Sequence, residues 1–248
     1  MNSQLMIDAL KGHRSIRKFK EDPIQEGHIR AIIEAAQSAS TSSNIQAYTV
    51  IGVKDPARKQ ALSVMSGNQR YVAECPLMLV WCADLHRLEL VMHMHDGQLH
   101  QNTETLLLGT VDAALAAQNA AIAAEALGYG IVYIGGIRNN PDEVAELLRL
   151  PGNVYPVFGM CVGKPDQAPE LRPRLPLHAV YHEETYAEDE TLLDAIKTYD
   201  DTLQAYYANR SGGGRVSNWS AETASRMQAD KLRPHMKQHL NRQGFRLE

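Results

Sequence analysis

Residues 103–136 read TETLLLGTVDAALAAQNAAIAAEALGYGIVYIGG, and this stretch decides the expected fold. Its first part is rich in alanine, which favours helix and lets another backbone approach closely. We therefore expect one long, central packing helix from Thr103 to Leu127, with Gly128 supplying the stop. The apolar run from Ile131 to Ile134 then predicts a strand that enters the glycine pair Gly135-Gly136.

Polar side chains interrupt this apolar helix and argue against a membrane-spanning role. They are Asp112, Gln118, Asn119 and Glu125. No uninterrupted apolar run elsewhere reaches the length of a membrane span. The amino terminus, MNSQLMIDALKG, lacks the basic start and apolar block of a signal peptide. We expect neither a membrane span nor a cleaved leader.

Three further segments have the character of strands. Residues 77–83, LMLVWCA, form a continuous apolar run suited to a strand buried on both faces, as in the centre of a sheet. Residues 154–162 form a second apolar strand, and residues 47–53 are strand-like. Strands and helices do not alternate evenly enough for a doubly wound sheet, so we expect an α+β fold with a small central sheet.

The remaining pattern predicts helices around this sheet. They are expected at residues 2–12, 23–38, 56–65, 141–148, 192–208 and 221–243. Beyond Lys164 a proline-rich connector, PDQAPELRPRLPLH, is expected to wrap rather than to fold alone. We therefore predict a single domain, 1–248, in which 165–248 is a wrapping excursion with a flexible glycine-rich loop at 210–215.

Composition indicates an ordinary globular protein. The chain has 248 residues, 44% of them hydrophobic and 22% charged, with a formal net charge of −4. Cys75, Cys82 and Cys161 sit in apolar runs without a CxxC spacing, which favours buried reduced thiols and a reducing cytoplasm. Eight basic and three acidic residues lie between Asn209 and Glu248, so this tail carries +5. Without interleaved aromatic residues or a nucleic-acid motif, the tail favours an anionic small molecule over nucleic acid.

Several common motifs are absent. The glycines near residue 128 follow a helix and lack the third glycine of a Rossmann fingerprint, and the chain has no P-loop, GxSxG elbow or HExxH helix. Four histidines between residues 86 and 100 match no standard metal spacing, so we expect no metal.

The segment His13-Arg14-Ser15-Ile16-Arg17 joins two guanidinium groups and a hydroxyl. Arginine presents a planar fork of donors that matches phosphate oxygens, and serine adds a neutral donor. Taken alone, the segment favours a solvated basic turn after an amphipathic helix over a phosphate site.

Four other segments have ordinary structural explanations when each is taken alone. Residues 41–46, TSSNIQ, are a run of small donors, and Gln69 lies in a polar loop. Gly135 and Gly136 stand at a strand end, where backbone amides can approach a planar ligand. Arg172-Pro173-Arg174 holds two guanidinium groups in an extended segment.

Taken together and in this order, these segments resemble the nitroreductase family, in its branch of FMN-binding oxygen-insensitive NADPH nitroreductases and NADPH-flavin oxidoreductases. The resemblance covers nearly the whole chain and is strongest in HRSIRKF, in the block from residue 106 to 140, in PVFGMCVG and in LRPRLP. It implies a nitroreductase-like fold, with a small, mainly antiparallel sheet flanked by helices. It also implies an intertwined homodimer with FMN at the subunit interface.

The resemblance further implies which residues bind the cofactors. For FMN these are His13, Arg14, Ser15 and Arg17 at the phosphate and ribityl chain; Arg172 and Arg174 near the phosphate; Thr41 and Ser43 lining the pocket; Gln69 at the polar edge of the ring; and Tyr133, Ile134, Gly135 and Gly136 against the ring. For NADPH they are Arg210, Arg215 and Arg233. No catalytic acid or nucleophile is required.

The activity implied by the resemblance is an FMN-dependent NADPH oxidoreductase. It would transfer hydride to FMN N5 and pass two electrons to nitroaromatics, quinones or free flavin by a ping-pong mechanism. We expect a cytoplasmic homodimer acting on small molecules, with neither nucleic acid nor membrane as partner. The alternatives are a non-catalytic flavin-binding protein for storage or sensing on the same fold, and an anion-binding regulator without flavin.

Overall fold

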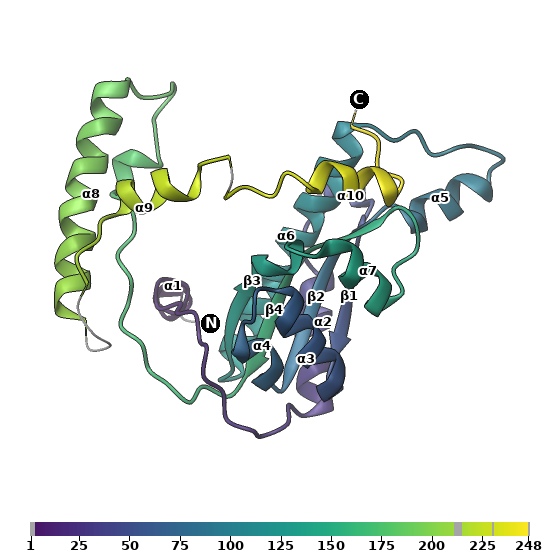
Figure 1. Ribbon diagram of the computed structural model, residues 1–248, viewed down its shortest axis with the longest axis horizontal. Helices are drawn as coiled ribbons and strands as arrows, with labels where there is room; N and C mark the ends of the chain where they lie inside the picture. The colour runs from purple at the N-terminus through teal and green to yellow at the C-terminus, as the bar shows by residue number, and fades with distance from the viewer. Residues whose placement is uncertain (1–2, 211–214, 230, 248) are drawn as a thin grey trace. The chain divides into compact units, whose positions relative to one another are not determined.

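The computed structural model describes residues 3–210, 215–229 and 231–247. The chain divides into two compact units (Figure 1). The first comprises Met1–Pro169 with His235–Glu248, and the second comprises Glu170–Pro234. Most of the predicted glycine-rich loop, residues 211–214, lies outside the described residues.

A four-stranded sheet forms the centre of the first unit, in the order β1-β2-β4-β3. Its strands are β1 (Tyr48–Val53), β2 (Leu77–Asp84), β3 (Gly130–Ile134) and β4 (Val154–Gly163). Every neighbouring pair is antiparallel. All residues of β2 are buried in the middle of the sheet, which confirms the strand predicted from LMLVWCA.

The first unit contains the helices α1 (Ser3–Lys11), α2 (Glu26–Gln37), α3 (Pro56–Met65), α4 (Arg70–Glu74), α5 (His86–His93), α6 (Thr103–Ala126), α7 (Pro141–Leu148) and α10 (Met236–Arg242). Those that pack on the sheet cover both of its faces. Alternate residues of β2 divide between the two cores, as period-two geometry requires. Leu79 and Trp81 pack with residues of α2 and α6, whereas Met78 and Val80 pack with residues of α3, α4 and α7. The α+β class with a small antiparallel sheet is thus confirmed.

Helix α6 is the central packing helix that its composition predicts. Asn102 caps it by accepting a hydrogen bond from Thr105 N, and Gly128, with φ +81°, follows its end. A Cβ on Gly109 would lie 3.0 Å from Ala83 Cβ, so the helix approaches the sheet through its small residues. Within the described part of the chain, α6 is the one helix with the length and apolar composition of a membrane span. Its buried alanine face on the sheet accounts for that composition.

The second unit is built on α8 (Asp189–Asn209) and α9 (Trp219–Arg226), with a short 3-10 turn at Leu177–Ala179. Tyr199, Leu203 and Tyr207 of α8 form its small core. Tyr199 OH donates a hydrogen bond to Pro173 O at 2.8 Å, which ties the proline-rich connector to α8.

The prediction of one last helix over 221–243 is wrong. Two helices occur there, α9 and α10, and they belong to different units. Pro234 lies between them, and proline removes a backbone donor and clashes with the preceding helical turn. Helix α4, which follows directly after Gln69, is an element that the pattern did not predict.

Candidate functional site

The basic segment 13–17 is held against strand β3. Ser15 forms a parallel bridge with Ile131, and Ile16 N donates to Ile131 O at 2.8 Å. A Cβ on Gly130 would overlap the Ile16 side chain, so glycine at this position permits the close approach. The bridge fixes the segment beside the start of β3 while Arg14 and Arg17 remain exposed.

His13 and Arg14 lie toward α6. His13 Nδ1 is 2.6 Å from Glu125 Oε1 of α6, and both side chains are between a quarter and a third exposed. Arg14 and Glu125 line a cavity of about 300 Å³ between α1 and α6. Glu125 also acts on Tyr133, whose pKa is raised to about 12, chiefly by burial and then by the Glu125 charge.

Arg17 connects the basic segment to Gln69. Its guanidinium carbon lies 6.0 Å from the centre of the Tyr71 ring, within the range of a cation–π contact. Tyr71 OH donates a hydrogen bond to Gln69 Oε1, and Gln69 Nε2 donates to Ser66 O at 2.6 Å. An amide nitrogen carries two hydrogens, so Gln69 retains one donor for a ligand.

The glycine pair at the end of β3 meets Gln69. A Cβ on Gly136 would overlap both Gln69 Nε2 and the carbonyl of Ser66. A Cβ on Gly135 would instead meet only Arg138 Nη2, at 3.7 Å. Gly136 is therefore packed against Gln69, and Gly135 borders open space that a planar ligand can occupy. Ile134, which precedes the pair, is fully buried.

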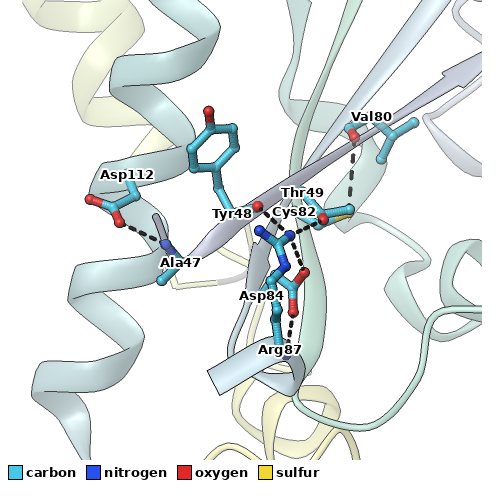
Figure 2. A network of polar contacts seen from close by, with 8 residues as sticks. All are labelled: Ala47, Tyr48, Thr49, Val80, Cys82, Asp84, Arg87 and Asp112. Atoms are coloured by element: carbon cyan, nitrogen blue, oxygen red, sulfur yellow. Dashed lines mark hydrogen bonds and ion pairs between the residues drawn. The ribbon is translucent and has the colours of Figure 1, made fainter. Parts of the chain in front are cut away.

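The loop before β1 is held in an uncommon backbone conformation. Ser43, Asn44 and Gln46 have φ values of 49°, 58° and 57°, in the left-handed region that few residues other than glycine adopt. The buried carboxylate of Asp112 accepts hydrogen bonds from Ala47 N at 2.9 Å and Ser42 N at 3.4 Å (the Ala47 contact is drawn in Figure 2). Such strain is commonly held at functional sites.

Two further features belong to this loop. The hydroxyl of Thr41 is buried and has no hydrogen-bond partner, which leaves it available to a ligand. At the other end of the loop, Arg87 Nη2 donates to Tyr48 O at 3.0 Å, to Thr49 Oγ1 at 2.8 Å and to Asp84 Oδ2 at 2.9 Å (Figure 2). This network fixes the start of β1 and so the position at which the loop ends.

The second unit holds an arginine cluster around Tyr207, which is only 2% exposed. Arg172 Nη2 donates to Tyr207 OH. The guanidinium carbons of Arg172, Arg210 and Arg215 lie 5.5, 5.8 and 4.1 Å from the centre of the Tyr207 ring. We call these three side chains the arginine cluster. Three predicted cofactor residues, from sequence positions 172 to 215, are thus brought together on one tyrosine.

Arg174 and Arg233 stand outside this cluster. Arg174 is exposed, and its charge partly opposes burial, which raises the pKa of Tyr199. Arg233 is half-buried and lines a cavity of about 520 Å³ with Arg226 and Lys231. Both predicted residues therefore lie in basic surroundings of the second unit.

The chain matches known protein families over most of its length. Residues 10–164 match the nitroreductase family, and residues 172–248 match the nitroreductase family, C-terminal domain. The chain belongs to the nitroreductase family. The family fold and the resemblance seen in the sequence are thereby confirmed.

Nitroreductase relatives match nearly the whole chain. The "FMN reductase (NADPH)" of Bacillus subtilis is 43% identical over 96% of this chain and 97% of that protein. The "oxygen-insensitive NADPH nitroreductase" of Salmonella typhimurium is 44% identical over 96% and 97%.

Solved structures agree with these relatives. The hypothetical oxidoreductase YcnD of Bacillus subtilis superposes with a TM-score of 0.94 at 39% identity, covering 98% of each chain. The NADPH:FMN oxidoreductase of Vibrio harveyi, solved with NAD+, gives 0.88 at 42% identity, covering 97% of this chain and 98% of that one.

Several residues that contact the predicted site residues were not predicted from the sequence. Tyr71, Ser66 and Glu125 contact predicted residues in the first unit, and Tyr207 and Glu222 do so in the second. For Tyr71, its position two residues after Gln69 is the one sequence signal that indicates a contact with Gln69. In the described residues no three His, Cys, Asp or Glu side chains gather into a possible metal site. The three cysteines are free and buried, as expected.

Proposed function

We propose that this chain is an FMN-dependent oxidoreductase that uses NADPH and delivers two electrons to a small acceptor. One observation carries the proposal: predicted FMN residues from three distant segments meet along β3. The basic segment is hydrogen-bonded to Ile131, Gly135 and Gly136 directly follow the strand, and Gln69 packs on Gly136. From Ile131 to Ile134 the strand spans about 10 Å, so the two sets of predicted residues lie at opposite ends of one strand.

The donors along β3 suit the two ends of FMN. Ser15 and Arg17, with His13 and Arg14, supply hydroxyl, guanidinium and imidazole donors for the phosphate and ribityl chain. The open side of Gly135 suits the flat ring, and the remaining Gln69 N–H suits its polar edge. Thr41 offers its unpartnered hydroxyl, and Ser43 lies in the same strained loop.

Bound FMN supplies the two-electron chemistry. The chain's own residues bind and orient it, and donors fixed at the polar edge favour the negative charge that reduction leaves there. Because no proton transfer by a side chain is needed, we assign no catalytic acid or nucleophile.

Arg210 and Arg215 of the arginine cluster are proposed to bind the 2′-phosphate of NADPH, with Arg233 as a further basic residue of that site. The relatives support this choice, since the Bacillus subtilis and Salmonella typhimurium proteins are both named for NADPH. Arg172 and Arg174 are proposed to act near the FMN phosphate.

We further propose a ping-pong cycle, in which NADPH and the acceptor use the same cleft in turn, with nitroaromatics, quinones or free flavin as acceptors. The protein is proposed to work as a cytoplasmic homodimer. Exposed Leu107, Val111 and Leu115, spaced four apart on α6, supply an apolar stripe for the subunit contact. The non-catalytic alternative is not favoured, because the relatives are named as reductases.

Anaerobic titration of the FMN-loaded protein with NADPH tests the function. We expect loss of the yellow flavin absorbance at one equivalent of NADPH per FMN, and its return when a quinone or nitroaromatic is added. A protein that binds FMN but is not bleached by NADPH would support the storage alternative. Failure to bind FMN at all would contradict both.

A further inference from the structure

One carboxylate lies among the cations of the arginine cluster. Glu222 Oε1 of α9 lies 2.5 Å from Arg215 Nη2 in an ion pair and accepts a hydrogen bond from Ser217 Oγ at 2.5 Å. Its Oε2 lies 3.8 Å from Arg226 Nη2. The Glu222 side chain is 17% exposed and the Arg215 side chain is 48% exposed, so the carboxylate is largely shielded from water while the guanidinium stays open to a ligand. An ionic interaction of a partly shielded carboxylate is weakened less by water and salt than one between two fully exposed groups.

Glu222 remains ionised in this setting. The hydrogen bond from Ser217 lowers its pKa most, and the charges of Arg215, Arg226 and Arg172 lower it further. The carboxylate therefore occupies donors of Arg215 that a phosphate oxygen would need, because both anions fit the same face of the guanidinium fork.

Arg215 is anchored independently of Glu222. Its guanidinium carbon lies 4.1 Å from the centre of the Tyr207 ring, and its backbone N donates to Tyr207 O at 3.2 Å. The buried Tyr207 ring packs against the guanidinium of Arg215 and holds it in place. Arg215 can thus exchange one anionic partner for another without losing its position.

Building on the function proposed above, we propose that Glu222 is an internal counter-ion, which competes with the 2′-phosphate of the nucleotide for Arg215 and so speeds release of NADP+. When the phosphate leaves, the carboxylate takes its place, so the largely shielded charge of Glu222 regains its pair with Arg215. Release of NADP+ must precede acceptor binding if both use one cleft.

The same arrangement makes Glu222 a determinant of nucleotide specificity. A nucleotide without a 2′-phosphate leaves the Arg215–Glu222 pair intact, so its binding does not depend on Glu222. A nucleotide with the phosphate must displace the carboxylate and also meets its negative charge, and placing like charges together is unfavourable.

Isothermal titration of the oxidised, FMN-loaded protein with NADP+ and with NAD+ tests this inference, because neither nucleotide can reduce the flavin. In Glu222→Gln the side-chain volume and an acceptor for Ser217 are kept while the charge is removed. We expect the Kd for NADP+ to fall about tenfold and the Kd for NAD+ to stay unchanged. Stopped-flow measurement should show slower NADP+ dissociation by a similar factor.

The matched control is Glu190→Gln, an exposed glutamate at the start of α8, which should change neither Kd. Weaker or unchanged NADP+ binding in Glu222→Gln would overturn the inference, since it would mean that Glu222 only positions Arg215 or has no part in binding. Suppose that the wild-type protein prefers NADP+ and that Arg215→Ala loses this preference. Weaker or unchanged NADP+ binding in Glu222→Gln then overturns only the counter-ion role of Glu222, and the proposed nucleotide site stands. If wild-type protein binds both nucleotides equally and Arg215→Ala changes nothing, the nucleotide site itself is wrong, and the inference falls with it.

Discussion

Gly135 and Gly136 are neighbours in the chain with opposite demands on space. Gly136 has no room for a methyl group, because the Ser66 carbonyl is backbone and cannot swing away. Gly135 has room, and that room is where the proposed flavin ring lies. Glycine at position 136 is thus required by packing within the fold, and glycine at position 135 is required by the proposed ligand.

The pair Gly136→Ala and Gly135→Ala tests this distinction. We expect Gly136→Ala to lower the free energy of unfolding by about 1–3 kcal/mol, because it overpacks a closed contact. Gly135→Ala should unfold like the wild type in urea but bind FMN at least several-fold more weakly. Equal FMN affinity in Gly135→Ala and wild-type protein would show that the ring lies elsewhere.

At the scale of elements, α10 is fastened to the first turn of α7. Asp142 accepts hydrogen bonds from Arg242 and, at 2.8 Å, from the fully buried His239 Nδ1. The Arg242 hydrogen bond is the largest influence lowering the pKa of Asp142 from its ordinary value of 3.8, and His239 lowers it further, while partial burial opposes them. A carboxyl whose pKa is lower in the folded state stabilises that state above pH 3.8, and this contribution is lost as the pH falls through the lowered pKa.

Asp142→Asn should therefore destabilise the protein at neutral pH. We expect a loss of no more than about 1 kcal/mol, since half of the Asp142 side chain is exposed. In urea-unfolding measurements the difference from wild type should shrink as the pH falls below 3.8 and vanish once the pH is below the lowered pKa of Asp142. The neighbouring Glu143→Gln, exposed on the same helical turn, is the control and should show no such pH-dependent difference. A constant difference at every pH would contradict an ionic role for Asp142.

The elements differ in how well the sequence predicts them. A continuous apolar run such as residues 77–83 predicts a central strand because both of its faces are covered by helices. Pro234 also indicates a boundary between α9 and α10, because proline interrupts a helix. The contacts of Tyr71 with Arg17 and of Tyr207 with Arg172 depend on side-chain packing between distant segments, which no local pattern encodes.

In the whole molecule, the proposed subunit contact lies on the apolar stripe of α6. Val111 is 52% exposed in the middle of the apolar stripe on α6, although the opposite face of that helix is buried against the sheet. An apolar stripe on a central helix is typical of a surface that another protein covers.

Val111→Asp should convert the dimer to a monomer in sedimentation velocity measurements. It should also weaken FMN binding if the cofactor lies at the subunit interface. Val64→Asp on α3 is the matched control, since Val64 is 54% exposed but lies outside the stripe. A wild-type protein that sediments as a monomer, or a Val111→Asp variant that remains a dimer, would contradict this interface.

The proposed placement of FMN along β3 puts its phosphate at the basic segment 13–17. Its most direct test is the ratio of the Kd values for riboflavin and FMN, measured by flavin fluorescence in wild-type and Arg17→Ala proteins. Riboflavin lacks the phosphate, and a charge-assisted hydrogen bond to a phosphate is among the stronger polar contacts. We predict that wild-type protein prefers FMN and that Arg17→Ala reduces this preference at least tenfold, with riboflavin binding unchanged. An unchanged ratio in Arg17→Ala would contradict the placement of the phosphate and with it the proposed orientation of FMN along β3.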